Sequence, residues 1–341
     1  GYESLKSNEE IFQRTINVLR NKNGLVILPE GNHAGFRRLR QLKKGICRIA
    51  FQADEASGFN LNIKIIPVGI EFTHYTRYRQ VLTVVYGNPV EVSEFHSLYK
   101  KTPEIALNEL RKKLSSEIKK LIVHIESKED YEAIDELRSL INGKYSDDIR
   151  FPKLFRDRIM IDKLNKLKET DLSLYNKICS LTLKVKKKAG KLKTNYRLLA
   201  KKKHPLGWLL AGTCGLLLFL PLFIYGNIFN LTFLLLPNLQ TRKIKDAQFH
   251  STMKYGLSFA LALILTPLFL ILSFIIFSPW WLSILVFLTI PVSGLFAWNY
   301  YLVLMRIIGG FRIKNYLWSG NKEYITLKKD HDELVSLVTA L

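Results

Sequence analysis

Cysteine is scarce in this chain of 341 residues, and the three that occur lie far apart. Cys47, Cys179 and Cys214 are odd in number and have no CxxC spacing, which argues against a disulfide framework and against a cysteine metal or redox pair. We expect packing residues in a reducing cytosol. Zinc-ligand spacing and the usual basic and aromatic nucleic-acid modules are also lacking, so the sequence predicts no metal, no cofactor and no nucleic-acid partner.

Acidic residues are few beside basic ones. Lys and Arg number 51 against 29 Asp and Glu, which gives a formal net charge of +22. Such a chain is expected to have an anionic partner, either nucleic acid or phospholipid headgroups. Because long apolar segments occur in the same chain, anionic membrane lipid is the simpler partner.

Charged residues almost disappear between residues 205 and 304, and two runs there are long enough to span a membrane. Residues 257–277 and 281–304 predict a transmembrane hairpin connected at Ser278-Pro279. Neither run contains a buried ionisable residue, which makes a transporter less favoured. A basic stretch, Lys184 to Lys203, precedes the apolar region; it is either a solvated helix face or, as we favour, a contact with anionic lipid.

Residues 206–239 are too long for one span and too short for two. Basic residues on both sides predict a re-entrant or tilted helical hairpin that turns near Pro221, Gly226, Asn227 and Asn230. The alternative is one long tilted span. The localisation predicted from this pattern is a bacterial cytoplasmic membrane, crossed several times, with the active domain on the cytosolic face.

The first part of the chain mixes short apolar runs with helical patterns. Ser7 and Glu10 have capping-box spacing and predict a helix that ends near Asn21 to Gly24. Leu25 to Leu28 predicts a strand buried on both faces, and two further strands are expected at Ile63 to Phe72 and Val81 to Tyr86. A helix around Ile46 to Ala53 lies between them, so the pattern predicts an α/β sheet with crossover helices.

Helical periodicity dominates after Thr102 and Pro103, which form a good helix start. Further helices are predicted at 131–141 and 153–168. The predicted organisation is an incomplete α/β core at 1–98, a helical and basic juxtamembrane region at 99–204, a membrane domain at 205–305 and a cytoplasmic tail at 306–341.

The most informative stretch is Leu28 to Arg48, where the predicted strand ends in Pro29-Glu30-Gly31 and cations crowd together. Glycine lets a ligand approach the backbone, and guanidinium groups bind phosphate bidentately. The predicted phosphate site comprises Glu30, Gly31, Asn32, His33, Arg37, Arg38, Arg40, Lys43 and Lys44. A basic loop without a ligand is the alternative.

Family resemblance rests on three blocks in order. "ILPEG", followed by basic residues and "LKKGICRIAFQA", resembles the F-P-E-G-T-R-S block of the glycerolipid acyltransferases. "IIPVGI" at Ile65 to Ile70 resembles the later V-P-V block, and "VVYGNPVEV" at Val84 to Val92 resembles the strand and turn after it. The resemblance covers roughly the first 125 residues. It implies that this part of the chain is an incomplete glycerolipid-acyltransferase-like sheet.

The resemblance also implies roles for the site residues. Glu30 and Gly31 would help build the acceptor site, and Pro67 and Val68 would form its wall. Asn32 and His33 stand where the family often has Thr-Arg, and Arg37, Arg38 or Arg40 would compensate. The family's base is a His followed by an Asp at H-x4-D spacing, which deprotonates the acceptor hydroxyl.

No histidine of this chain has that spacing; His124 with Glu129 comes closest but lies downstream of the PEG block. We therefore expect the catalytic pair upstream of Gly1, in an N-terminally truncated chain. The predicted reaction transfers an acyl group from acyl-CoA or acyl carrier protein to 1-acylglycerol 3-phosphate, giving phosphatidic acid. Acylation of glycerol 3-phosphate or another lysolipid, and a noncatalytic lipid-binding membrane module, remain alternatives.

Overall fold

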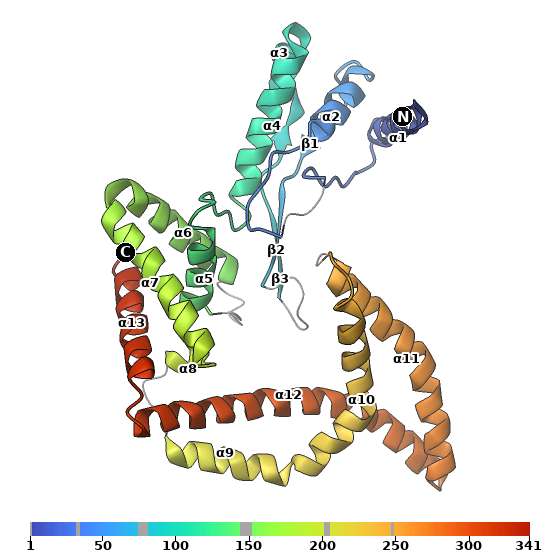
Figure 1. Ribbon diagram of the computed structural model, residues 1–341. Helices are drawn as coiled ribbons and strands as arrows, with labels where there is room; N and C mark the ends of the chain where they lie inside the picture. The colour runs from blue at the N-terminus through green and yellow to red at the C-terminus, as the bar shows by residue number, and fades with distance from the viewer. Residues whose placement is uncertain (1, 32–34, 74–80, 144–151, 201–204, 247–248) are drawn as a thin grey trace. The chain divides into compact units, whose positions relative to one another are not determined.

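The computed structural model describes residues 2–31, 35–73, 81–143, 152–200, 205–246 and 249–341 (Figure 1). Asn32 and His33 of the predicted site, and Lys201 to Lys203 at the end of the basic stretch, lie outside the described residues. The described chain divides into two compact units. The first unit contains the described residues of 1–73, 80–134 and 144–166. The second unit contains the described residues of 135–143 and 167–341.

Helices make up most of the first unit. Its members are α1 (Tyr2–Arg20), α2 (Gly45–Glu55), a 3-10 turn (Val92–Phe95), α3 (His96–Lys101) and α4 (Pro103–Lys119), while α5 (Tyr131–Ile141) and α6 (Lys153–Thr170) continue into the second unit. The core lies between α2 and α4, where Phe51 and Leu110 are fully buried. Periodic apolar residues explain this packing, because each helix buries one face.

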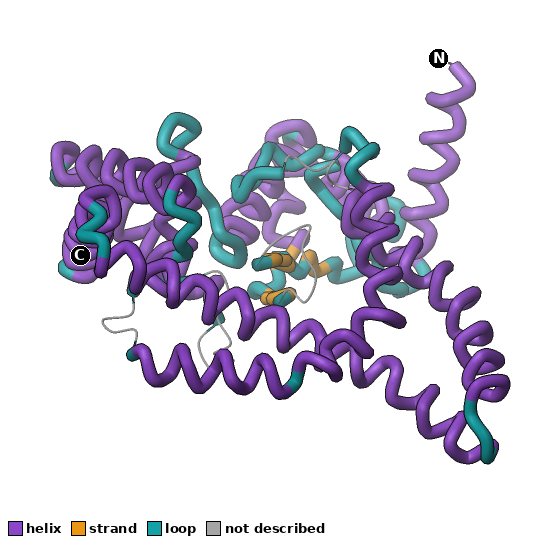
Figure 2. The backbone as a smooth tube through the Cα atoms, turned by 60° about the horizontal axis from the view of Figure 1, so that its bottom comes forward, coloured by secondary structure: helices purple, strands orange, loops and turns teal. Residues whose placement is uncertain are grey.

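The described strands, orange in Figure 2, form two short pairs, and both pairs are antiparallel. The predicted sheet with crossover helices is not seen among the described residues. β1 (Lys64–Ile65) pairs with β4 (Val90–Glu91), and β2 (Val68–Phe72) pairs with β3 (Leu82–Tyr86). The long strand predicted at Ile63 to Phe72 is divided at Pro67, which has no N–H to donate. The strand predicted at Val81 to Tyr86 is confirmed as β3. A crossover helix joins parallel strands, whereas antiparallel strands can be joined by a short turn. Because both pairs are antiparallel, the topology differs from the prediction.

The predicted buried strand at Leu25 to Leu28 is wrong for the described chain. These residues belong to no strand, and the exposed fractions of Val26 and Leu28 are 92% and 73%. A strand buried on both faces needs strand neighbours, and the four described strands pair only among themselves. The predicted start of the first helix is also wrong, because Ser7 lies inside α1.

Beside the ends of α5 and α6, the second unit contains three helices outside the long apolar region: α7 (Leu172–Lys191), α8 (Tyr196–Leu199) and α13 (Lys322–Thr339). α7 and α13 pack against one another and bury Tyr175, Ile178, Leu327 and Leu334. Asp171 caps α7 by accepting a hydrogen bond from the N–H of Leu174 at 2.9 Å. These contacts form a small helical bundle.

The apolar region contains α9 (Leu206–Leu218), α10 (Leu220–Thr241), α11 (Phe249–Ile276) and α12 (Trp280–Trp318). Among the described residues, α10, α11 and α12 are long and apolar enough to cross a membrane. The two spans predicted at 257–277 and 281–304 correspond to α11 and α12. This composition is that of a membrane-associated protein.

Residues 206–239 differ from the predicted hairpin. The chain bends at Phe219, whereas Pro221 to Asn230 are helical. Leu209 of α9 lies against Gly310 of α12, and Gly226 of α10 lies against the carbonyl oxygen of Ser293. α9 and α10 therefore contact successive parts of α12 instead of folding onto each other (Figure 1). The division of the chain into four regions stays a prediction.

Candidate functional site

The Pro29-Glu30-Gly31 turn is fastened to the basic segment that follows it. The N–H of Gly31 donates to the carbonyl of Leu28 at 3.3 Å, and the N–H of Lys43 donates to the carbonyl of Pro29 at 2.8 Å. Gly31 has φ +80°, a left-handed conformation that glycine adopts at little cost. The turn and Lys43 are thus neighbours although twelve positions separate Lys43 from Gly31.

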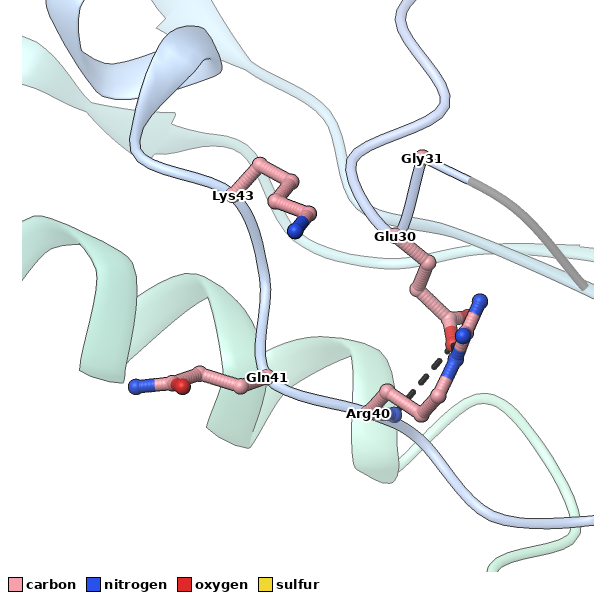
Figure 3. A pocket seen from close by; sticks show the side chains of 5 residues that line it. All are labelled: Glu30, Gly31, Arg40, Gln41 and Lys43. Carbon is pink, nitrogen blue, oxygen red and sulfur yellow. Dashed lines mark hydrogen bonds and ion pairs between the residues drawn. The ribbon is translucent and has the colours of Figure 1, made fainter. Parts of the chain in front are cut away.

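An open pocket of about 370 Å³ lies at this turn (Figure 3). Its lining residues are Glu30, Gly31, Arg40, Gln41 and Lys43. The Oε2 atom of Glu30 accepts hydrogen bonds from the backbone N–H of Arg40 at 3.2 Å and from its Nε at 3.5 Å. Lys43 extends toward Gly31, and Gln41 points away from Glu30. Four of the nine residues predicted for the site therefore line one pocket.

The charges of the pocket suit a phosphate monoester. The Nε atom of Arg40 donates to Glu30, the guanidinium of Arg40 lines the pocket, and the Lys43 side chain is exposed. Guanidinium and ammonium groups both bind phosphate oxygens. Two cations beside one carboxylate leave a net positive charge. Gln41 adds an amide that can donate to a hydroxyl or phosphate oxygen.

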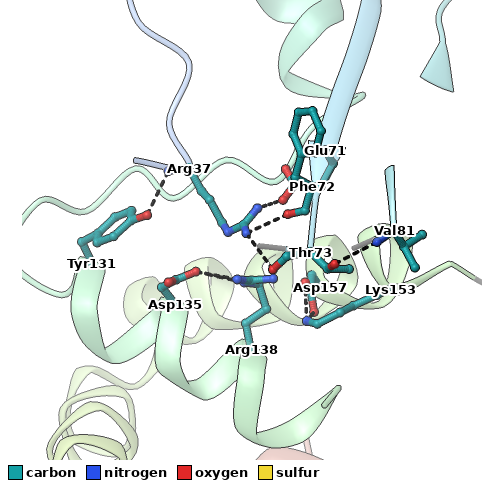
Figure 4. A network of polar contacts seen from close by, with 10 residues as sticks. All are labelled: Arg37, Glu71, Phe72, Thr73, Val81, Tyr131, Asp135, Arg138, Lys153 and Asp157. Atoms are coloured by element: carbon teal, nitrogen blue, oxygen red, sulfur yellow. Dashed lines mark hydrogen bonds and ion pairs between the residues drawn. The ribbon is translucent and has the colours of Figure 1, made fainter. Parts of the chain in front are cut away.

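The Arg37 side chain is buried in the first unit and does not line the pocket. Figure 4 shows its polar contacts. Its guanidinium forms an ion pair with the buried carboxylate of Glu71 and donates to the carbonyl of Phe72 at 2.9 Å. Its backbone N–H donates to the hydroxyl of Tyr131 at 2.9 Å. Arg37 thus joins the basic segment to the end of β2 and the start of α5.

Arg38 also holds the segment in place. Its Nε and Nη2 atoms donate to the carbonyls of Ile125 and Ser127, both at 2.9 Å. The N–H of Ile125 donates in turn to the carbonyl of Arg37 at 2.8 Å. Residues 121–127, which we call the anchor segment, therefore fix the backbone that leads to Arg40.

His124, the residue nearest to the sought catalytic pattern, belongs to this anchor segment. Its Nδ1 accepts a hydrogen bond from the N–H of Leu39 at 3.0 Å, so that nitrogen is unprotonated. Burial, aided by the charge of Lys119, lowers the pKa of His124. The geometry gives His124 a structural role, with its acceptor nitrogen already occupied.

This role predicts a pH dependence. The folded chain resists protonation of His124, so the unfolded chain binds the proton first as the pH falls below about 6.5. The His124 contribution to stability should be complete above that pH and lost as the pH falls through the lower folded-state pKa. Urea unfolding of wild type and His124→Asn, which keeps an acceptor near Nδ1 but does not titrate, measures the difference. Identical pH profiles for the two proteins would contradict this role.

The remaining predicted residues lie apart from the pocket lining. Lys44 forms a surface ion pair with Glu104 at 2.8 Å, and the hydrogen bond from Lys44 lowers the pKa of Glu104. Pro67 is buried and its carbonyl accepts from the N–H of Gly87 at 2.8 Å. Val68 is 37% exposed. The wall role of Pro67 and Val68 stays a prediction.

The structure brings one histidine and one aspartate together that the sequence search missed. His96 Nε2 lies 2.7 Å from Asp54 Oδ2, and Asp54 also accepts from the N–H of Leu61. Asp54 is in the last turn of α2, whereas Lys43 precedes its first turn, roughly 15 Å away along the helix. The pair therefore joins α2 to α3 and is remote from the pocket. No group of three potential metal ligands occurs among the described residues.

The residues that hold the site in place were not predicted from the sequence. Gln41, Glu71 and Tyr131 carry no local signal. The anchor segment did have one, because Val123 and Ile125 alternate with the polar residues His124 and Glu126, and both apolar side chains are buried. Such alternation indicates an extended segment with one buried face.

Comparison with known proteins gives two distant relatives in Saccharomyces cerevisiae. Glycerol-3-phosphate O-acyltransferase 2 is 26% identical over 118 residues, which are 34% of this chain and 16% of the relative. Glycerol-3-phosphate O-acyltransferase 1 is 24% identical over 147 residues, 42% of this chain and 19% of the relative. The matched region thus spans less than a fifth of either relative. No family model and no solved structure matches the chain.

Both relatives are yeast proteins, so the predicted bacterial membrane stays a prediction. Both are acyltransferases by name, which agrees with the resemblance carried by the PEG block. The similarity is partial and distant. It supports a glycerolipid acyltransferase family and a transferase role for this chain.

Proposed function

We propose that this chain supplies the acceptor-binding part of a membrane-associated glycerolipid acyltransferase. The observation that carries the proposal is the pocket at the PEG turn, where Arg40 and Lys43 face one open space beside Glu30. A phosphate monoester bound there would be held by two cations. Distant similarity to acyltransferases supports the same reaction class.

The reaction would convert a hydroxyl into an ester. The hydroxyl oxygen attacks the carbonyl carbon of an acyl thioester, supplied by acyl-CoA or acyl carrier protein, and the carbon–sulfur bond breaks. A base removes the hydroxyl proton, and the leaving thiolate takes up a proton. We assign phosphate binding to Arg40 and Lys43, and orientation of Arg40 to Glu30. We assign no catalytic base among the described residues.

Two acceptors fit this pocket, because both carry a glycerol 3-phosphate group. The names of both relatives favour glycerol 3-phosphate. The PEG block does not distinguish this acceptor from 1-acylglycerol 3-phosphate, whose acylation would give phosphatidic acid. We place glycerol 3-phosphate first, since both comparisons point to it.

Acceptor binding tests the proposal directly. Titration calorimetry with glycerol 3-phosphate and with 1-acylglycerol 3-phosphate should give weaker binding for Arg40→Gln and for Lys43→Gln, by about tenfold or more each, because each loses a charge-assisted hydrogen bond. Lys44→Gln is the matched control, since it removes the same charge one position away but from the pair with Glu104.

The outcomes separate the alternatives. Equal loss in Lys44→Gln would show a general charge effect and remove the pocket from the proposal. Unchanged affinity in both pocket variants would also remove the pocket from the proposal. Tighter binding of 1-acylglycerol 3-phosphate than of glycerol 3-phosphate would reverse the order of acceptors. Binding without acyl transfer in the full-length protein would support a noncatalytic lipid-binding module.

A further inference from the structure

The last third of α12 extends beyond the length of a membrane span. Its 39 residues correspond to about 58 Å, whereas the hydrocarbon core of a bilayer is about 30 Å thick. Trp280 and Trp281 begin the helix, and Arg306 is its first charged residue, about 39 Å further on. The part that carries Arg306, Arg312 and Lys314 therefore lies at or beyond one membrane surface.

Four of the six lysines of α7 face acidic residues of α13 in the same bundle. Lys177 lies 2.6 Å from Glu333, and Lys188 lies 2.7 Å from Asp330, which also pairs with Lys184. Burial raises the pKa of Asp330, but hydrogen bonds from Lys188 and Lys184 outweigh it and leave that pKa lowered. Lys191 pairs with Glu323 in the same way. This part of the predicted lipid-binding stretch is thus neutralised inside the chain.

Other cations gather where α7 and α8 meet α12. Arg312 donates from Nη1 to the carbonyl of Lys193 at 2.7 Å, which places the end of α7 beside α12. Leu198 of α8 packs against Gly309. Arg197 adjoins Leu198, and Arg306 lies one helical turn before Gly309 and Gly310. We name this group the exit cluster; it comprises Lys193, Arg197, Arg306, Arg312 and Lys314.

The exit cluster has no described acidic partner. α8, α9, α10 and α12 contain no Asp or Glu. The acidic residues of α13 are already paired with lysines, Asp332 with Lys328 and the others with α7. Arg197 and Arg306 are exposed, and the ammonium group of Lys314 lies 5.3 Å from the ring of Trp318. A surface of this charge attracts anions, and beside a membrane helix the nearest source is the lipid headgroup.

We infer that the exit cluster binds the phosphate groups of anionic lipids at the membrane surface where α12 leaves the bilayer. The cluster replaces Lys184, Lys188 and Lys191 of α7 as the lipid contact, because those lysines pair with acidic residues of α13. This inference does not depend on the proposed acceptor pocket, since none of its residues lines that pocket.

Lipid retention tests the exit cluster. The full chain is incorporated into bilayer discs that contain phosphatidylcholine and phosphatidylglycerol in equal parts, extracted in detergent, and its retained lipids are quantified by mass spectrometry. Wild type should retain more phosphatidylglycerol than phosphatidylcholine. Arg197→Gln, Arg306→Gln and Lys314→Gln, singly and together, should lower that ratio by about fivefold for each cation that contacts lipid. High salt should weaken the preference in the wild type.

The matched control removes equal charge elsewhere. Lys112, Lys113 and Lys120, changed together to Gln, lie in surface pairs on and just after α4 and should leave lipid retention unchanged. Arg306→Lys keeps the charge and should retain the preference, which separates charge from misfolding. Equal loss in the α4 control, or an unchanged ratio in the exit-cluster variants, would overturn the inference. Release of the lipid by excess inorganic phosphate would instead identify a small-anion site, and oligonucleotide binding by the cluster without lipid preference would also overturn it.

Discussion

Glu71→Ala should lower the unfolding free energy of the first unit by roughly 3–5 kcal/mol. The carboxylate of Glu71 is buried and pairs with the buried guanidinium of Arg37, which also reaches the carbonyl of Phe72. Without Glu71, the buried guanidinium of Arg37 loses this ion pair, and a buried charge that loses a partner is costly. The urea midpoint of this unit, followed by pulse proteolysis, measures the loss.

Two comparisons identify the cause. The double variant Arg37→Leu with Glu71→Leu removes both charges and should recover a large part of the lost stability, because an apolar pair of similar volume leaves no buried charge. Glu104→Ala breaks the exposed pair with Lys44 and should hardly move the midpoint. A Glu71→Ala protein as stable as the Glu104→Ala protein would refute the role of the buried pair.

Gly69→Ala should cost about 1–3 kcal/mol, because space rather than backbone conformation requires glycine there. A Cβ atom on Gly69 would lie 2.3 Å from the backbone oxygen of Leu121, which cannot move as a flexible side chain would. The displaced residue is the first of the anchor segment, and His124 and Ile125 of that segment hold Leu39 and Arg37. The variant should therefore also weaken acceptor binding at Arg40.

Gly45→Ala is the matched control, since a Cβ atom there meets nothing within 4 Å at the start of α2. It should leave stability unchanged or slightly increased. Hydrogen exchange of the anchor segment measures the local effect, which should be faster in Gly69→Ala alone. Normal exchange and normal acceptor binding in Gly69→Ala would contradict the coupling between β2 and the pocket.

Helices were predicted well because their signals are local. The apolar positions of α2 and α4 recur at helical spacing, and two of them, Ala50 and Leu110, lie in the core. The strand at Leu25 to Leu28 was predicted wrongly because its apolar run says nothing about a partner strand. Similarly, the composition of 206–239 indicated a turn at proline, glycine and asparagine, but Pro221 occupies the first turn of α10, where proline is tolerated.

In the candidate site as well, residues close together in the sequence were predicted, and partners remote in the sequence were not. Glu30, Arg40 and Lys43 lie within fourteen consecutive residues and were found together from the sequence. The partners that position them are remote in the chain: Glu71 holds Arg37, and the anchor segment holds Arg38 and Leu39. A cluster of cations in a sequence cannot show which of them face solvent and which are paired inside, so Arg37 and Lys44 were grouped with the pocket residues.

The unbroken course of α12 has a mechanical consequence. In the apolar region, α12 contacts α10, where Ser293 lies against Gly226. Near its other end, Arg312 of α12 donates a hydrogen bond to the carbonyl of Lys193, just after α7. When a rigid helix of about 58 Å tilts by about 10° around one end, its other end moves by about 10 Å. Membrane thickness influences the tilt of spanning helices. In a chain whose α12 spans a bilayer, a change in bilayer thickness would therefore be expected to move the bundle of α7, α8 and α13.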